Sequence, residues 1–101
     1  MIGEFKVVHL PERGRYELRK GDQVLGYADA VPRGDCVLLP YVYIDPPLRG
    51  GNLGTELLHE ALQDLRSKDL KVVPICPFVV AFFKRHAEYA DMVHSNSAQL
   101  I

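Results

Sequence analysis

The spacing of hydrophobic residues in this chain changes near residue 45. Before that point, runs rich in Val, Leu and Tyr are separated by the short breaks "RG", "GD" and "PRGD". Such runs predict strands, and breaks built from Gly and Asp predict the tight turns of hairpins. The pattern therefore predicts an antiparallel meander of four strands: Glu4–His9, Arg15–Lys20, Val24–Val31 and Cys36–Ile44.

After "DPPLRGGN" the period becomes helical. One apolar stripe predicts a helix and is formed by Leu53, Leu57, Leu58, Ala61, Leu62 and Leu65. Asn52 stands at its expected N-cap, and Glu56 suits the positive end of the helix dipole. Then "LKVVPIC" predicts a buried strand, and "PFVVAFFKRH" predicts a second helix with proline at its first position.

This order of elements predicts an α+β fold with a mixed, mostly antiparallel sheet. It consists of a four-strand meander, a strand–helix–strand crossover and a final helix. The crossover places the fifth strand parallel to the fourth. A doubly wound fold is disfavoured because the strands come first and in a block. We expect one domain over residues 1–93 and a polar tail over residues 94–101.

Composition and charge argue against several classes of protein. The chain has 101 residues and a formal net charge of -1, so it lacks the strongly basic surface of nucleic-acid binders. Its longest apolar run, residues 72–83, contains Pro74 and Pro77 and is too short to span a bilayer. The first residues lack the apolar core of a secretory signal. We therefore expect a cytoplasmic protein with neither a nucleic-acid nor a membrane partner.

The two cysteines and four histidines show no metal-ligand spacing. Cys36 and Cys76 are the two cysteines, and their separation matches neither a disulfide framework nor a zinc motif. His9 and His94 have no partner that the sequence pattern reveals, and His59 is expected on a solvated helix face. The sequence therefore predicts no metal site.

A glycine-rich turn precedes the first helix. In "LRGGNLG", Gly50, Gly51 and Gly54 leave backbone N–H groups accessible at a helix N-terminus, where the dipole favours a phosphate group. Arg49 would add a bidentate donor for phosphate oxygens. The pattern of neither the P-loop nor the dinucleotide-binding motif is present. Taken alone, the glycines favour a simple turn with close packing of the helix on the sheet.

A resemblance changes that interpretation. "LRGGNLGTELLHEAL" resembles motif A of the GCN5-related N-acetyltransferases, with Arg49 at its first and Gly54 at its last position. Asn52 departs from the glycine of that pattern. "KVVPICPFVVAFFKRHAEYADMV" resembles the end of a minimal single-domain subfamily that carries a Cys-Pro-Phe motif. The resemblance implies a GCN5-related fold and a loop that holds the pyrophosphate of acetyl-CoA or coenzyme A.

The resemblance also implies a set of cofactor contacts. The residues expected to bind the cofactor are Ile44, Arg49, Gly50, Gly51, Asn52, Leu53, Gly54 and Thr55. The fourth and fifth strands would splay apart near residues 41–44 and 75–76. The pantetheine arm would lie in that gap.

Cys76 is the first candidate for the chemistry. It stands before Pro77, at the expected N-cap of the second helix, where thiol pKa values fall and thiolates become nucleophiles. The alternative is a small buried side chain. The resemblance favours the reactive role, and two chemistries stay open. Either Cys76 takes the acetyl group covalently, or an amine attacks the thioester directly.

Tyr41 and Tyr43 are the remaining catalytic candidates. The minimal subfamily often carries His-Thr-Glu where this chain has Tyr41-Val42-Tyr43. The larger family often uses a tyrosine of the final helix as an acid, where this chain has Phe82 and Phe83. Tyr41 or Tyr43 would substitute, unless both are packed strand aromatics.

These residues predict an acetyl-CoA-dependent acyltransferase. Its acceptor would be a primary amine of a small molecule or a protein, on an open side of the sheet or one completed by a partner chain in a homodimer. The main alternative is a module that binds coenzyme A without turnover. A structural domain that uses the glycines only as a turn is a third, weaker hypothesis.

Overall fold

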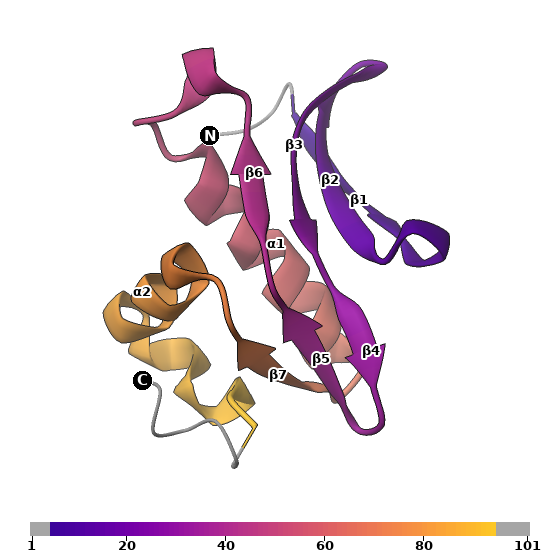
Figure 1. Ribbon diagram of the computed structural model, residues 1–101, viewed down its shortest axis with the longest axis vertical. Helices are drawn as coiled ribbons and strands as arrows, with labels where there is room; N and C mark the ends of the chain where they lie inside the picture. Colours follow the sequence, from indigo (N-terminus) through magenta and orange to yellow (C-terminus); the bar gives the residue numbers. More distant parts are fainter. Residues whose placement is uncertain (1–4, 95–101) are drawn as a thin grey trace.

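The computed structural model describes residues 5–94 and has the predicted α+β organisation (Figure 1). Its strands are β1 (Lys6–Leu10), β2 (Arg15–Lys20), β3 (Gln23–Asp29), β4 (Val31–Arg33), β5 (Cys36–Leu39), β6 (Val42–Ile44) and β7 (Lys71–Pro74). Its helices are α1 (Leu53–Ser67) and α2 (Pro77–Arg85), with short 3-10 turns η1 (Pro11–Arg13), η2 (Pro46–Leu48) and η3 (Ala87–Met92). The start of the predicted first strand at Glu4 and the tail beyond His94 lie outside the described residues.

The strands form two sheets rather than one. The first sheet has the order β1-β2-β3-β6 and is antiparallel throughout. The second has the order β4-β5-β7, in which β5 and β7 run parallel. The sequence analysis predicted the parallel pairing of β5 with β7, but it did not predict that the strands divide into two sheets.

The division arises because two predicted strands are broken. The predicted strand Cys36–Ile44 is interrupted at Pro40, which has no N–H to continue a ladder. The Leu39 carbonyl accepts hydrogen bonds from the N–H groups of Ile75 and Cys76, at 3.2 and 3.4 Å. Beyond this point the chain separates from β7, and its next strand, β6, pairs with β3 instead. The predicted splay between these strands is therefore confirmed, and it starts at residue 40.

The predicted strand Val24–Val31 is also broken, at Ala30 between β3 and β4. The Ala30 N–H donates to the Gly14 carbonyl at 2.8 Å, outside the ladder.

Gly26 allows β6 to approach β3 closely. A Cβ at Gly26 would lie 2.5 Å from the Tyr43 carbonyl oxygen, so only glycine fits there without a shift.

The core lies between the first sheet and α1, which contacts β1, β2, β3 and β6 (Figure 1). The predicted apolar stripe supplies the helix side of that core, since Leu57, Leu58 and Leu62 are fully buried. Helix α2 and η3 lie beside β7, and their buried Phe82 and Tyr89 extend the same core. No helix among the described residues is long and apolar enough to cross a membrane.

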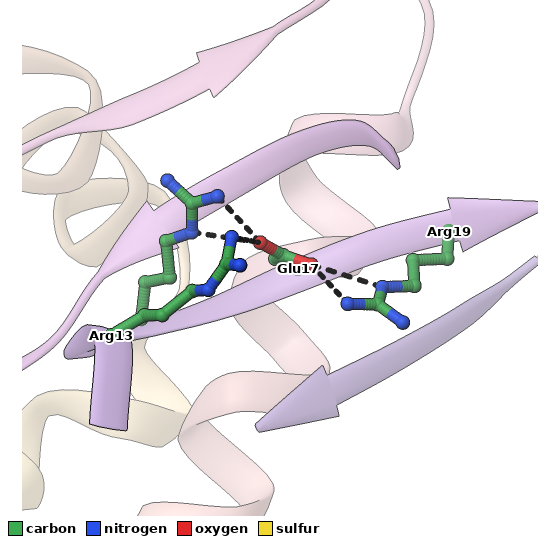
Figure 2. A network of polar contacts seen from close by, with 4 residues as sticks. Arg13, Glu17 and Arg19 are labelled. Atoms are coloured by element: carbon green, nitrogen blue, oxygen red, sulfur yellow. Dashed lines mark hydrogen bonds and ion pairs between the residues drawn. The ribbon is translucent and has the colours of Figure 1, made fainter. Parts of the chain in front are cut away.

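A buried carboxylate lies on the other face of the first sheet. Glu17 has no exposed surface. Its Oε2 accepts two hydrogen bonds from Arg15 and its Oε1 accepts two from Arg19, all of 2.6 to 2.9 Å. Figure 2 shows the Glu17 carboxylate between Arg13 and Arg19. The Arg13 Nη1 lies 3.9 Å from Glu17 Oε2. Burial alone would raise the pKa of Glu17, but the arginines outweigh it and hold the pKa below its ordinary value.

We expect the protein to lose stability in acid. The pKa of Asp64 is also lowered, because hydrogen bonds from Lys68 and Tyr16 outweigh the effect of its burial. Carboxyls with lowered folded-state pKa values stabilise the fold above their unfolded pKa values and lose this contribution as pH falls. The ordinary values are 4.5 for Glu17 and 3.8 for Asp64. Burial also lowers the pKa of His9 from its ordinary value of 6.5. The urea midpoint should therefore begin to fall below about pH 6.5 and fall further as the carboxyls protonate below about pH 5.

The control is Glu17→Gln, which removes the titrating group. This variant should be less stable than the parent at pH 7 and should show a shallower fall between pH 5 and pH 3. A parent protein whose urea midpoint stays level or rises across that interval would contradict the assignment.

Candidate functional site

The turn between β6 and α1 contains the predicted glycine-rich loop. The 3-10 turn η2 reverses the chain, and Gly50 then adopts a φ of 91°, which favours glycine. The first hydrogen bond of α1 runs from the Glu56 N–H to the Asn52 carbonyl. Within the described part of the chain, the N–H groups of residues 50–55 have no recorded backbone acceptor. They form the donor set that an anion at a helix N-terminus requires.

A pocket of about 410 Å³ opens at this loop. Its walls come from the end of β6, the loop, the start of α1 and the start of α2. The lining residues are Tyr41, Val42, Ile44, Leu48, Arg49, Gly50, Gly51, Gly54, Thr55 and Phe78. The structure therefore brings together most of the residues that the sequence analysis assigned to the cofactor.

Gly54 allows the close packing that the glycines predicted, but its nearest neighbour is helix α2 rather than the sheet. A Cβ at this position would lie 2.9 Å from Cζ of Phe78, at the start of α2. The glycine thus lets the two helix N-termini approach and form one side of the pocket. Phe78 was missed by the sequence analysis, because only the packing of α2 against α1 brings it to the loop.

Arg49 is anchored at the mouth of the pocket. Its Nε donates to the Ile44 carbonyl at 2.7 Å, and its guanidinium lies 5.2 Å from the centroid of the Tyr43 ring. The two terminal nitrogens have no recorded hydrogen-bond acceptor among residues 5–94. They carry the paired donors that a phosphate oxygen prefers.

Tyr41 and Tyr43 differ in their surroundings. Tyr41 lines the pocket and is 47% exposed. Tyr43 does not line it and stacks on Tyr27, with ring centroids 5.5 Å apart. Of the two predicted tyrosines, only Tyr41 therefore lines the pocket.

Comparison with known proteins identifies the family of this chain. A family model described as GCN5-related N-acetyl-transferase matches residues 15–92, most of the chain. The chain belongs to the GCN5-related N-acetyltransferase family. The match includes the whole of the loop, both long helices and the strands β2 to β7.

A solved structure supports the fold. One that matches is the 1.85 Å crystal structure of a GNAT-family protein from Desulfovibrio desulfuricans, with a TM-score of 0.54 and 22% identity. The alignment covers 75% of this chain and 52% of that one, so this chain spans about half the length of its structural neighbour. No curated protein matches the sequence significantly.

Cys76 occupies the predicted N-cap of α2 in this GCN5-related domain. It is half-buried, its backbone is extended, and its side chain makes no capping hydrogen bond. It is not among the residues that line the pocket at the loop. A second, apolar hollow beside α2 is lined by its neighbours Ile75 and Pro77. Cys76 and Cys36 are both free thiols, so no disulfide joins them.

Two predicted contacts of the loop are not part of the pocket wall. Asn52 is exposed at the N-cap of α1 with a φ of -99°, so it does not use the positive φ that glycine would offer, and its side chain forms no cap. Leu53 packs against the hydrophobic core instead of lining the pocket. Any contact of these two residues with a ligand would therefore be made by their backbone N–H groups.

One expectation about α1 was wrong. His59 does not lie on a solvated face: its Nδ1 is 2.8 Å from the hydroxyl of the buried Tyr89. Gln63 donates to the same hydroxyl at 3.2 Å. This cluster joins α1 to η3. It was not visible in the helical periodicity, since Tyr89 is thirty residues away along the chain.

Proposed function

We propose that this chain binds acetyl-CoA at the loop between β6 and α1 and transfers the acetyl group to a primary amine. The observation that carries this is the pocket of about 410 Å³ at the start of α1. Its lining residues all fall within residues 15–92, which the family model matches. A module that only fills a structural role would not require N–H groups and an arginine to converge on one cavity.

The pyrophosphate would lie against the loop. The N–H groups of residues 50–55 would donate to its oxygens, and the terminal nitrogens of Arg49 would contact it from the side. The pantetheine arm would then run along the apolar wall formed by Ile44 and Phe78, toward Tyr41. This direction follows the gap between β6 and the residues after β7.

Bound acetyl-CoA would supply an activated thioester. We assign Tyr41 as the proton donor to the sulfur that leaves as the amine nitrogen forms its bond to the acetyl carbon. The C–S bond would break and the Tyr41 hydroxyl would give its proton to the sulfur. The amine would release a proton to water, and water would return a proton to the Tyr41 oxygen. Tyr43 keeps Arg49 and Tyr27 in position. Cys76 remains a neighbour of the site, and direct attack by the amine is the chemistry that we propose.

The acceptor would approach from an open side. Within the described residues, only short turns connect β1, β2 and β3, so no helix covers the outer face of the first sheet. This favours an exposed amine, on a small molecule or a protein chain, or a site completed by a second copy of the domain. A cytoplasmic location belongs to the same proposal, because acetyl-CoA would have to be available.

The proposal is tested by calorimetry with coenzyme A and acetyl-CoA on the purified chain. We expect one ligand per chain and micromolar dissociation constants for both. Absence of binding at millimolar ligand would overturn the proposal. Turnover is then measured as release of free thiol from acetyl-CoA in the presence of a panel of primary amines. Binding without thiol release on any amine would exclude the catalytic part and leave a coenzyme A-binding module.

A further inference from the structure

Three side chains of metal-ligating type meet at the turn between β4 and β5. Asp35 lies in that turn, Cys36 is the first residue of β5, and His94 follows η3. One ligand atom from each lies within 4.8 Å of the other two. His94 Nε2 is 3.6 Å from Asp35 Oδ1. None of the three lines the pocket at the loop.

The fold holds these residues together through β7. Val72 pairs with Val37 on one side, and on the other it forms an isolated bridge to Val93. The His94 N–H then donates to the Val72 carbonyl at 2.8 Å. Backbone hydrogen bonds thus fix the residues on either side of β7, which is how chain segments far apart in the sequence reach one point.

The donor set suits zinc. A thiolate sulfur, an imidazole nitrogen and a carboxylate oxygen are the three ligand types that Zn²⁺ takes in proteins. With bonds of about 2.0 to 2.3 Å, ligand atoms of a tetrahedral site lie roughly 3.3 to 3.7 Å apart. The distance between His94 Nε2 and Asp35 Oδ1 already falls in this range. Small rotations of the side chains would bring the thiol sulfur into it.

The burial of the three groups also fits a site with one open position. Cys36 is buried, and its thiol only donates a weak hydrogen bond to the Arg33 carbonyl at 3.3 Å. His94 is 20% exposed, whereas Asp35 is 88% exposed. A metal here would be enclosed by sulfur and nitrogen and would face water on the side of the carboxylate.

We propose that Asp35, Cys36 and His94 form a Zn²⁺ site, with water as the fourth ligand. On binding, the Cys36 thiol loses its proton to water, and the Zn–S bond replaces a bond to one of the ion's own water ligands. The metal links the β4–β5 hairpin to the residue that follows η3. The site is separate from the proposed acetyl-CoA pocket and does not depend on it.

The test uses Co²⁺ as a spectroscopic probe on the untagged, reduced chain. Thiolate coordination should give a near-ultraviolet charge-transfer absorption at one equivalent of Co²⁺, and Zn²⁺ should abolish it. Cys36→Ser should remove the band and lower the Zn²⁺ affinity at least about 100-fold, since loss of a direct ligand exceeds the usual effect of an outer-shell partner. His94→Ala should do the same, and Asp35→Ala should have a smaller effect.

Cys76→Ser is the matched control, because it removes the other thiol and should leave the band unchanged. Two results would overturn the proposal: no charge-transfer band in the parent, or Zn²⁺ affinity that stays the same in both Cys36→Ser and His94→Ala, which would indicate an adventitious ion only. Circular dichroism of each variant verifies that it is folded. Since His94→Ala leaves the buried thiol in place, the test still decides if Cys36→Ser does not fold.

Discussion

Replacing Tyr41 with phenylalanine is expected to lower kcat for acetyl transfer about 100-fold, with little change in the dissociation constant of acetyl-CoA. Tyr41 lines the pocket, near the point where β6 and β7 separate. Its removal leaves the departing sulfur without a donor, while the ring still fills its place. The measurement is thiol release at saturating amine, with affinity determined separately by calorimetry.

Tyr43→Phe is the matched control for this prediction. Tyr43 lies in β6, two residues beyond Tyr41, and both rings contact Tyr27. Tyr43 differs because it supports Arg49 and does not line the pocket. Its phenylalanine variant should keep kcat within a few-fold of the parent. Equal losses in the two variants would contradict the assignment of Tyr41 as the proton donor.

Cys76→Ser separates the direct mechanism from a covalent one. If the amine attacks the thioester directly, the serine variant keeps its activity and the parent acquires no acetyl group when incubated with acetyl-CoA alone. An acetyl adduct on Cys76 in the intact mass, together with loss of turnover in the serine variant, would show that the thiol carries the acetyl group.

Local chemistry made much of the fold predictable. The stripe of leucines predicted α1, and Pro77 predicted the start of α2, because both signals depend only on neighbouring residues. The break at Pro40 was missed because the segments on either side of it both form strands. Their partners decide the break: β5 pairs with β7, which comes more than thirty residues later, whereas β6 pairs with β3.

The same distinction applies to the candidate site. The loop was predictable because its glycines and Arg49 are contiguous and match a motif. Phe78 was not, since it reaches Gly54 only when α2 packs beside α1. Likewise, Asp35 and Cys36 are adjacent, but their meeting with His94 depends on pairing on both sides of β7. Sequence spacing alone could not reveal a cluster assembled by a sheet.

Substituting Gly51 with aspartate is expected to weaken binding of coenzyme A about 30-fold. Gly51 lines the pocket, and a Cβ there would make only an ordinary contact of 3.8 Å with the Leu48 carbonyl. Its φ is negative, so a side chain introduces no backbone strain. A carboxylate at this position would repel the pyrophosphate and compete for the N–H groups that bind it. Losing one charge-assisted hydrogen bond of about 2 kcal/mol corresponds to that factor.

Gly51→Asn is the control that isolates the charge, because its side chain has nearly the same size and shape. Calorimetry should find its affinity for coenzyme A within about threefold of the parent, a difference of less than 1 kcal/mol. The difference between the two variants should shrink as salt is added, since screening weakens repulsion between exposed charges. If both variants bind as tightly as the parent, the pyrophosphate does not lie at this loop. If both variants lose affinity equally, the size of the new side chain rather than its charge is responsible. The pyrophosphate then binds elsewhere on the pocket wall.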